Sequence, residues 1–154
     1  MSVLNKNIWH IPKYWRQHDI EPLIFDFYRI NECGEIVSLI TKKRMKNVKG
    51  SHGYEYINLF HPKTINPKNK RPKKGLMYRV HKLVACTFLE NSNRYIYNVV
   101  DHIDSDKTNN CVDNLEWVTY SENSRRARNK SKKEHIEVIE IAKNQLSLFP
   151  DEEE

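Results

Sequence analysis

The clearest alternation of apolar and polar residues in this sequence lies in the second half of the chain. The run YIYNVV (95–100) is apolar and aromatic, and it stops at Asp101 and His102. Residues 104–110 are polar and turn-forming, and they offer no apolar face. The alternating segment LEWV (115–118) is typical of a second strand. This pattern predicts a strand, a polar loop and a returning strand.

A helix is predicted directly after the second strand. Thr119 stands three residues before Glu122, which is the spacing of a capping box at a helix N-terminus. Asn123 then lies in about the first turn of this helix. The order of strand, loop, strand and helix therefore lets Asn123 face back toward Asp101 and His102.

The first half of the chain predicts a small sheet. Residues 28–39 are expected to form a hairpin that turns at Gly34, and YEYINLF (54–60) adds a third strand. Residues 28–60 should therefore form one antiparallel sheet. Residues 1–27 are rich in aromatic side chains but follow neither the helical nor the strand period, so an irregular packing segment is expected.

Residues 77–89 (MYRVHKLVACTFL) predict an amphipathic helix that forms the back wall of the core, and residues 78–80 complete a strand before it. One helical face carries the apolar positions Val80, Leu83, Val84, Thr87 and Phe88. His81 falls at the helix start. We favour a packed or capping role for it over contact with a phosphate.

A last apolar pattern covers residues 135–149. It predicts either a short amphipathic helix that packs back on the body or an element of a dimer. Pro150 and four acids then end the sequence as an expected frayed tail. Nothing after Lys133 is long or basic enough for a helix-turn-helix module.

Charge is distributed unevenly along the 154 residues. The net charge is +6 and the pI is about 9.2, but residues 135–154 carry −5, so residues 1–134 carry +11. Such a basic body favours a polyanionic partner, for which nucleic acid is the usual candidate.

The three cysteines are widely spaced and form no CxxC pair, so a structural zinc site is not expected. Reduced thiols are the expectation. The sequence has no apolar run of the roughly 18 residues that a membrane span needs, and no signal-peptide pattern. We therefore expect a cytoplasmic protein of a bacterium or a phage-infected host, with no membrane partner.

The residues near the first strand end have a chemical use together. An Asp oxygen and an Asn carbonyl are hard ligands that suit Mg²⁺, and an imidazole accepts a proton from water near neutral pH. These parts fit phosphodiester hydrolysis. Taken singly, each has a plainer explanation: a histidine after a strand usually caps or lies at the surface, and Asp and Asn usually form turns.

The order of these residues resembles the HNH, or ββα-metal, nuclease family, in its group-I-intron and phage homing-endonuclease branch. The resemblance covers roughly a third of the chain. The matching stretches are residues 80–85 (VHKLVA) with Phe88, 101–104 (DHID), 107–110 (KTNN), 114–119 (NLEWVT) and 121–123 (SEN).

The resemblance implies a role for each residue of this motif. His102 is the general base, Asp101 and Asn123 hold one divalent metal ion, and Asn114 is the middle Asn that pins the loop. The ion is expected to be Mg²⁺, with Mn²⁺ as the alternative, and the substrate is double-stranded DNA.

The N-terminal part shows a weaker similarity to the DNA-binding module that precedes HNH domains in homing endonucleases. Residues 28–60 carry its Tyr, Gly, Ser-Leu and Gly-Tyr pattern, and residues 9–14 (WHIPKY) match its opening in part. A usual glycine before Tyr14 is absent, and residues 15–27 are inserted.

Three basic segments, 42–49, 63–74 and 125–133, are predicted to contact the DNA backbone. For 63–74 a solvated linker is the compatible alternative, and for 125–133 a plain solvated helix face. The expected DNA-binding residues are Lys42, Lys43, Arg44, Lys46, Lys70, Arg71, Lys73, Lys74, Arg125, Arg126, Arg128, Lys130, Lys132 and Lys133.

The sequence therefore predicts an α+β protein with a ββα-metal HNH nuclease core and a small N-terminal antiparallel β-sheet lobe. Its expected parts are a β-rich DNA-binding lobe (1–62), a basic linker (63–75), the nuclease domain (76–134), and a C-terminal helix with an acidic tail (135–154). The alternatives are a catalytically silent HNH scaffold that binds DNA as a regulator, and a protein-interaction module that uses the C-terminal segment. Nicking or double-strand cleavage, the target sequence and the oligomeric state stay open.

Overall fold

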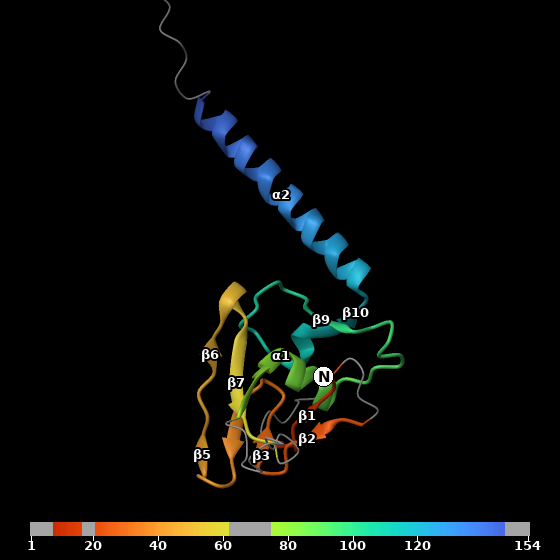
Figure 1. Cartoon of the computed structure of the whole chain (residues 1–154). Coiled ribbons are helices and arrows are strands. Elements are labelled where there is room, and N and C mark those ends of the chain that lie inside the picture. The colour runs from red at the N-terminus through yellow and green to blue at the C-terminus, as the bar shows by residue number, and fades with distance from the viewer. Residues whose placement is uncertain (1–7, 17–20, 62–74, 147–154) are drawn as a thin grey trace, which may run out of the picture. The chain divides into compact units, whose positions relative to one another are not determined.

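The computed structural model describes residues 8–16, 21–61 and 75–146 (Figure 1). The chain divides into two compact units, Met1–Val118, here called the body, and Thr119–Glu154, the C-terminal unit. The expected linker residues 63–74 and the acidic tail from residue 147 lie outside the described residues.

In its described residues, the body consists of small antiparallel sheets and one α-helix. Its helix is α1 (Val80–Phe88), and two short 3₁₀ turns cover Ser51–Gly53 and Val112–Asn114. The strands are β1 (Lys13–Tyr14), β2 (Leu23–Ile24), β3 (Tyr28–Ile30), β4 (Ile36–Ser38), β5 (Lys43–Arg44), β6 (Val48–Lys49), β7 (Glu55–Leu59), β8 (Leu76–Arg79), β9 (Val99–His102) and β10 (Leu115–Val118). The α+β prediction is confirmed.

Residues 28–60 form parts of two sheets, not the one sheet that we expected. β3, β4 and β5 make the first, and β6, β7 and β8 make the second. β7 pairs with β8 in the register Tyr56↔Arg79 to Leu59↔Leu76. Because β8 comes much later in the sequence, the local pattern of 28–60 gave no signal of this pairing.

The predicted turn at Gly34 is present between β3 and β4. Gly34 has φ +80°, and a Cβ atom there would meet the Val80 side chain at 2.6 Å. Asn31 closes the turn, since its Oδ1 accepts hydrogen bonds from the N–H groups of Cys33 (3.1 Å) and Glu35 (2.9 Å). Glycine is thus required both by backbone conformation and by close packing.

The hydrophobic core is formed by buried apolar residues of the strands and of α1. The apolar face predicted for α1 is confirmed for Val80, Leu83 and Val84, which are fully buried, while Thr87 and Phe88 are half-buried. The helix begins at Val80, because residues 76–79 belong to strand β8. The strands contribute Ile30, Ile36, Ile57 and Leu59 to the same buried cluster as the α1 residues.

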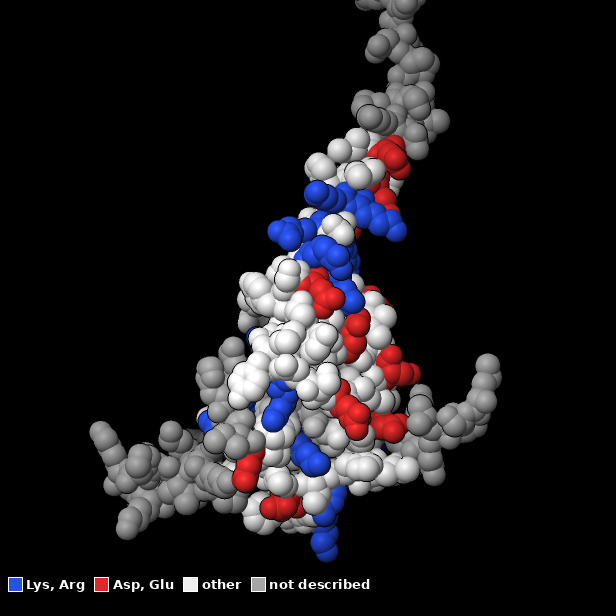
Figure 2. Space-filling view, turned by 90° about the vertical axis from the view of Figure 1, so that its right-hand side faces the viewer, with Lys and Arg blue, Asp and Glu red and all other residues white. Residues whose placement is uncertain are grey.

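The C-terminal unit contains one continuous helix, α2 (Tyr120–Leu146). The predicted capping box is confirmed: Thr119 Oγ1 accepts from Glu122 N (3.1 Å), and Glu122 Oε2 accepts from Thr119 N (3.1 Å). Figure 2 shows basic side chains gathered on the first part of α2 and acidic ones further along. None of the described helices is both long and apolar enough to cross a membrane.

The apolar residues of the second half of α2 are exposed rather than packed. Ile136, Val138, Ile139 and Ile141 have 40–64 % of their surface exposed. Packing of residues 135–149 on the body concerns both units and stays a prediction. A role in a dimer stays a prediction.

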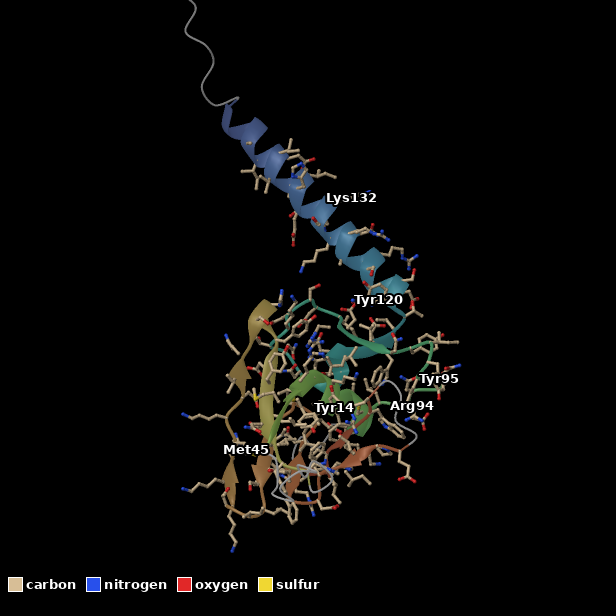
Figure 3. The ribbon with its side chains drawn as sticks, viewed as in Figure 1. Tyr14, Met45, Arg94, Tyr95, Tyr120 and Lys132 are labelled. Carbon is tan, nitrogen blue, oxygen red and sulfur yellow. A yellow bond between two sulfur atoms is a disulfide. The ribbon has the colours of Figure 1, made fainter. Side chains whose placement is uncertain are left out.

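Strand β9 begins later than the apolar run suggests. Residues 94–96 form a turn, and Tyr95 is 84 % exposed and points outward (Figure 3). Asn93 causes this turn, because its Oδ1 accepts from the N–H groups of Tyr95 (3.1 Å) and Ile96 (3.3 Å). Asp101 and His102 are the last two residues of the strand.

The expectation of three reduced cysteines is wrong for two of them. Cys33 and Cys111 form a disulfide across a sequence separation of 78 residues. It joins the β3–β4 turn to the segment before β10, where Val112 N also donates to Glu32 O (2.8 Å). Cys86 is a buried free thiol. Residues so far apart in sequence gave no spacing signal.

Candidate active site

The β9–β10 hairpin carries the first two candidate residues. Asp101 lies opposite Glu116, and His102 lies opposite Leu115. Neighbouring side chains of a strand point to opposite faces, and accordingly Asp101 is half-buried while His102 is only 4 % exposed. The Asp101 carboxylate also accepts a hydrogen bond from His102 N at 3.0 Å. The backbone N–H of His102 thus restricts the rotation of the Asp101 carboxylate.

Asn114 connects both ends of the loop between the two strands. Its Oδ1 accepts from Asp104 N (3.0 Å), and its Nδ2 donates to the Asp104 carboxylate (2.9 Å) and to Asn109 O (2.8 Å). Its own carbonyl accepts from Ile103 N (2.9 Å). These hydrogen bonds on one nearly buried residue fix the loop against the start of β10.

The loop carboxylates act as acceptors for this polar network. Asn109 and Asn114 donate to Asp104, and these hydrogen bonds lower the pKa of the Asp104 carboxyl. The N–H of Thr108 and then its hydroxyl donate to Asp106, whose pKa is lowered for the same reason. Both aspartates therefore stay ionised and hold the loop turns together.

His102 is connected to strand β7 through Asn110. Its Nε2 lies 3.3 Å from Asn110 Oδ1, and Asn110 Nδ2 donates to Glu55 Oε2 at 2.9 Å. Asn110 is 3 % exposed. Glu55 lies in the N-terminal part of the sequence, 55 positions from Asn110. Through Asn110, hydrogen bonds thus connect the candidate base to Glu55 on the distant strand β7 as well as to its own loop.

A ring cluster covers the other side of His102. The His81 ring lies 4.9 Å from it in an edge-on arrangement, and the Tyr54 ring lies 5.0 Å from His81. Lys107 Nζ sits 4.8 Å from the centre of the Tyr54 ring and donates to His52 O (2.9 Å). These contacts join the segment just before β7, helix α1 and the 103–114 loop near the imidazole.

His81 itself is buried, at 4 % exposed, and its Nδ1 has no hydrogen-bond partner among the described residues. Burial lowers its pKa to about 3, with smaller contributions from His102, Arg79 and Lys82. A ring that stays neutral in this position agrees with the packed role favoured for His81 over phosphate contact.

Asn123 belongs to the C-terminal unit. It lies half-buried in the first turn of α2, where its N–H donates to Thr119 O at 3.1 Å. Its pairing with Asp101 at one ion stays a prediction. Among the described residues, no group of three or more histidine, cysteine, aspartate or glutamate side chains is arranged to hold a metal ion.

The donor chemistry at these positions still suits a hard divalent cation. Mg²⁺ is commonly held by one or two protein oxygens, with water or phosphate as the remaining ligands. The Asp101 carboxylate in the body and the Asn123 amide oxygen in the C-terminal unit are each donors of this kind, and their joint binding of one ion stays a prediction. No cysteine or histidine cluster competes for a softer ion in the described residues.

The predicted DNA contacts are exposed where the structure describes them. Lys43 and Arg44 form β5, with Lys42 before it and Lys46 after it. Arg44 forms an ion pair with Glu35 at 2.6 Å. Four others, Lys70, Arg71, Lys73 and Lys74, lie outside the described residues.

The basic residues of α2 are exposed as well. In this segment Lys130 lies 4.0 Å from Glu134, and Lys133 lies 3.9 Å from Glu137. The acids one turn further along therefore balance part of the positive charge, as the solvated-face alternative requires. The exposed members of the segment are Arg125, Arg126, Arg128, Lys130, Lys132 and Lys133.

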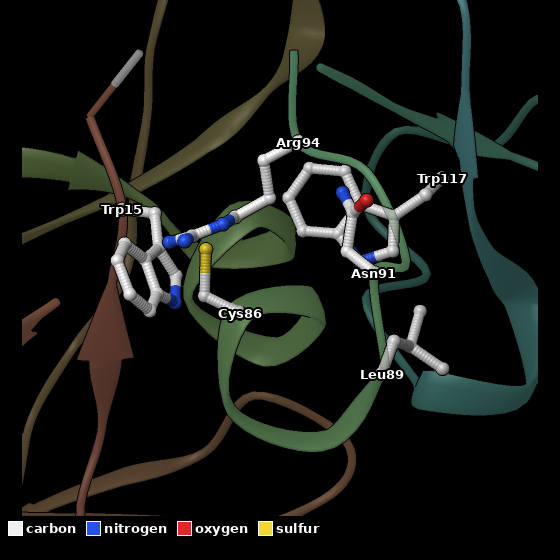
Figure 4. Close-up of a pocket in the computed structure, with 6 residues that line it drawn as sticks. All are labelled: Trp15, Cys86, Leu89, Asn91, Arg94 and Trp117. Carbon is white, nitrogen blue, oxygen red and sulfur yellow. The ribbon is translucent and has the colours of Figure 1, made fainter. Parts of the chain in front are cut away.

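A separate pocket lies beside α1 (Figure 4). It has a volume of about 280 Å³ and is lined by Trp15, Cys86, Leu89, Asn91, Arg94 and Trp117. The Arg94 guanidinium stacks 3.3 Å from the centre of the Trp15 ring. Burial raises the pKa of the Cys86 thiol to about 11, so the thiol stays protonated. None of the candidate catalytic residues lines this pocket.

Sequence reasoning missed the residues that surround His102 from outside its own hairpin. Asn110 was part of a matching stretch but received no role, and Glu55 and Tyr54 were considered only as strand residues. The strand alternation of 54–60 contained no sign of a polar partner. Only the fold brings β7 beside the 103–114 loop.

The sequence matches a family model described as HNH endonuclease over residues 95–125, which include the β9–β10 hairpin and the start of α2. It is 34 % identical to the DNA endonuclease I-HmuI of Bacillus phage SP01 over 129 residues, covering 80 % of this chain and 67 % of I-HmuI. It is also 42 % identical over 96 residues to YosQ, a candidate HNH homing endonuclease of the SPbeta prophage in Bacillus subtilis (strain 168).

The fold comparison leads to the same family. A solved structure of the HNH homing endonuclease I-HmuI, which concerns DNA binding and cleavage, superposes with a TM-score of 0.55 at 32 % identity. The match covers 75 % of this chain and 62 % of the solved chain, while the YosQ match covers 62 % of this chain and 49 % of YosQ. Together, the family model and the relative covered over two thirds of its length show that this chain belongs to the HNH endonuclease family.

Proposed function

We propose that this protein hydrolyses phosphodiester bonds of double-stranded DNA. The observation that carries the proposal is the placement of His102, an imidazole held by a hydrogen bond to Asn110 (3.3 Å) on a hairpin next to the Asp101 carboxylate. A fixed imidazole accepts the proton of an attacking water more efficiently than a mobile one. Membership of the HNH endonuclease family supports the same reaction.

Asp101 and Asn123 are the proposed ligands of one divalent ion, Mg²⁺ with Mn²⁺ as the alternative. The bound ion would supply positive charge against the phosphate and the leaving oxygen. In this scheme Asp101 holds the ion through its carboxylate, while its hydrogen bond from His102 N limits the rotation of that carboxylate. His102 removes the proton, and Asn114 keeps the loop between the two strands in one conformation.

Cleavage should depend on the ion. We expect purified protein to convert supercoiled plasmid to a nicked or linear form with Mg²⁺, and to lose this activity with a chelator. Adding excess Mg²⁺ or Mn²⁺ should restore it, whereas Ca²⁺, with larger and more flexible coordination, serves as a comparison. Full activity in chelator after dialysis would contradict the proposed metal site.

The basic segments 42–49, 63–74 and 125–133 are proposed to contact phosphates without reading bases. The affinity for DNA should then fall with salt, with a slope of about −0.9 in log K against log salt for each phosphate contact. Replacing Arg125, Arg126 and Arg128 together with alanine should reduce the slope by roughly 2 to 3. Fluorescence anisotropy on a DNA duplex measures both.

A matched control for this triple variant is Lys13→Ala, which removes an exposed positive charge outside the three segments. Its slope should equal that of the wild type. Affinity that does not change between low and moderate ionic strength would contradict the phosphate contacts altogether. An unchanged slope in the triple variant would contradict only the phosphate contacts proposed for the α2 segment.

One observation favours a second candidate, a DNA-binding scaffold without catalysis. His102 is only 4 % exposed, with the rings of His81 and Tyr54 packed around it. Hydrolysis requires that a water reach the ring through the small part of the residue that is accessible. The two candidates differ in the plasmid assay, because the scaffold binds DNA with the same salt dependence but cuts nothing under any metal condition.

A further inference from the structure

We propose that Asn110 and Glu55 are positioning residues that select the tautomer of His102, placing its hydrogen on Nε2 and leaving Nδ1 as the nitrogen that accepts a proton. The consequence for cleavage rests on the proposed function. The tautomer itself does not, because it follows from hydrogen-bond chemistry in the body of the protein.

The first step is the orientation of the Asn110 amide. Its Nδ2 lies 2.9 Å from Glu55 Oε2 and 3.2 Å from Thr108 O, and a carboxylate and a carbonyl only accept hydrogen bonds. Turning the amide over would place its oxygen against two other oxygens. Asn110 is 3 % exposed, so water does not compensate for that repulsion. The NH₂ group therefore faces Glu55 and Thr108.

The second step concerns the imidazole. With its NH₂ group directed away, Asn110 presents Oδ1 to His102 Nε2 at 3.3 Å. The amide oxygen has no hydrogen to donate, so a hydrogen bond between them requires the hydrogen on Nε2. A neutral imidazole carries one N–H, and its second nitrogen then keeps a lone pair. That nitrogen is Nδ1.

The third step concerns the residues that fix the orientation of the Asn110 amide. They lie outside the β9–β10 hairpin. Glu55 Oε2 accepts a second hydrogen bond from Asn47 Nδ2 (3.0 Å), and Glu55 pairs with Lys49 in the β6–β7 ladder. The loop that carries Asn110 is attached to the same region, since Lys107 Nζ donates to His52 O (2.9 Å). Strand β7 thus determines which ring nitrogen of His102, on β9, carries the hydrogen.

A plain structural role for Asn110 makes a different prediction. If Asn110 only closes the loop through Thr108, the hydrogen of His102 is free to occupy either nitrogen. Proton-detected ¹⁵N spectra of the histidine rings separate the cases, because they report which ring nitrogen carries hydrogen. The rings are recorded in their neutral form, and exposed His135 on α2 serves as an internal reference.

In the full-length wild type we expect His102 to be the Nε2–H form alone, while His135 shows exchange between both forms. Asn110→Leu removes the acceptor at nearly constant size, so His102 should become mixed like His135. Cleavage by Asn110→Leu should lose about 10- to 100-fold in kcat, as for other groups that orient a reacting side chain, with KM for DNA unchanged.

The double variant Asn110→Asp with Glu55→Gln exchanges the donor and the acceptor of the hydrogen bond between residues 110 and 55. The amide introduced on β7 would donate to the carboxylate introduced in the loop, and this carboxylate would still accept from His102. The carboxylate introduced in the loop also faces Thr108 O, which costs stability, but it still accepts from His102, so we expect this variant to keep the Nε2–H form and to recover part of kcat. Asn110→Asp alone places two carboxylates against each other and should lose stability. Asn47→Leu, which removes only the second donor to Glu55, is the matched control and should keep the wild-type ring spectrum.

The outcomes separate this inference from the proposed function. A wild-type His102 with hydrogen on Nδ1, or a ring spectrum unchanged in Asn110→Leu, would overturn the inference whether or not DNA is cut. If the wild type cuts no DNA but its ring is in the Nε2–H form and Asn110→Leu becomes mixed, the inference stands and the proposed function fails. If Asn110→Leu does not fold, loss of the Nε2–H form in the double variant overturns the inference, and its retention there with recovered kcat supports it.

Discussion

Replacing His102 by alanine should reduce DNA cleavage by about 100- to 10,000-fold while DNA binding stays within about twofold of the wild type. General-base catalysis by a positioned side chain contributes on this scale. Binding should be retained because the basic segments, and not His102, provide the proposed contacts with the phosphates. Single-turnover cleavage of a plasmid gives the rate, and anisotropy on a short duplex gives the affinity.

The His102 variant needs a control, since the ring is buried and its removal leaves a cavity next to His81 and Leu115. Far-ultraviolet circular dichroism and a urea titration will show whether the variant folds. His135→Ala removes an exposed histidine from α2 and should cut at the wild-type rate. A folded His102→Ala protein that nicks plasmid as fast as the wild type would refute the role of this residue.

The protein should lose stability in mild acid because of His81. The ring is buried beside His102 and Tyr54, and Arg79 and Lys82 are the nearby charges. Its pKa is about 3 in the folded protein, against about 6.5 for an unfolded histidine. Between these two values the unfolded chain binds one more proton than the folded chain, so stability rises with pH.

This contribution is fully present above about pH 6.5 and is lost as the pH falls toward 3. We expect the free energy of unfolding to decrease by about 2 kcal/mol between pH 7 and pH 5 from this residue alone. Urea titrations at both pH values measure it. His81→Gln should reduce the difference by this amount, and His135→Gln should preserve it. An equal pH difference in wild type and His81→Gln would show that other groups are responsible.

Local patterns predicted the parts of the nuclease motif that are close in sequence. The alternation of 115–118, the turn formers of 104–110 and the capping box at Thr119 each depend on residues within a few positions, and all three are present in the structure. The α1 face was predictable for the same reason. Where neighbours along the chain determine the conformation, the sequence pattern was sufficient.

Most of the unpredicted features depend on residues that are distant in sequence. β7 pairs with β8, Cys33 bonds to Cys111, and Asn110 bonds to Glu55. Strand alternation shows that β7 has a buried face but does not show which strand it joins. The late start of β9 is a different kind of error, in which the turn chemistry of Asn93 overcame an apolar run.

The Cys33–Cys111 bond also changes how the protein would respond to damage. Residues 33 to 111 form a closed covalent ring, and this ring contains α1, most of the strands and both positioning residues. One break in the backbone within the ring opens it without releasing either piece. A nicked molecule would therefore migrate as one species on a denaturing gel until a reductant separates it into two.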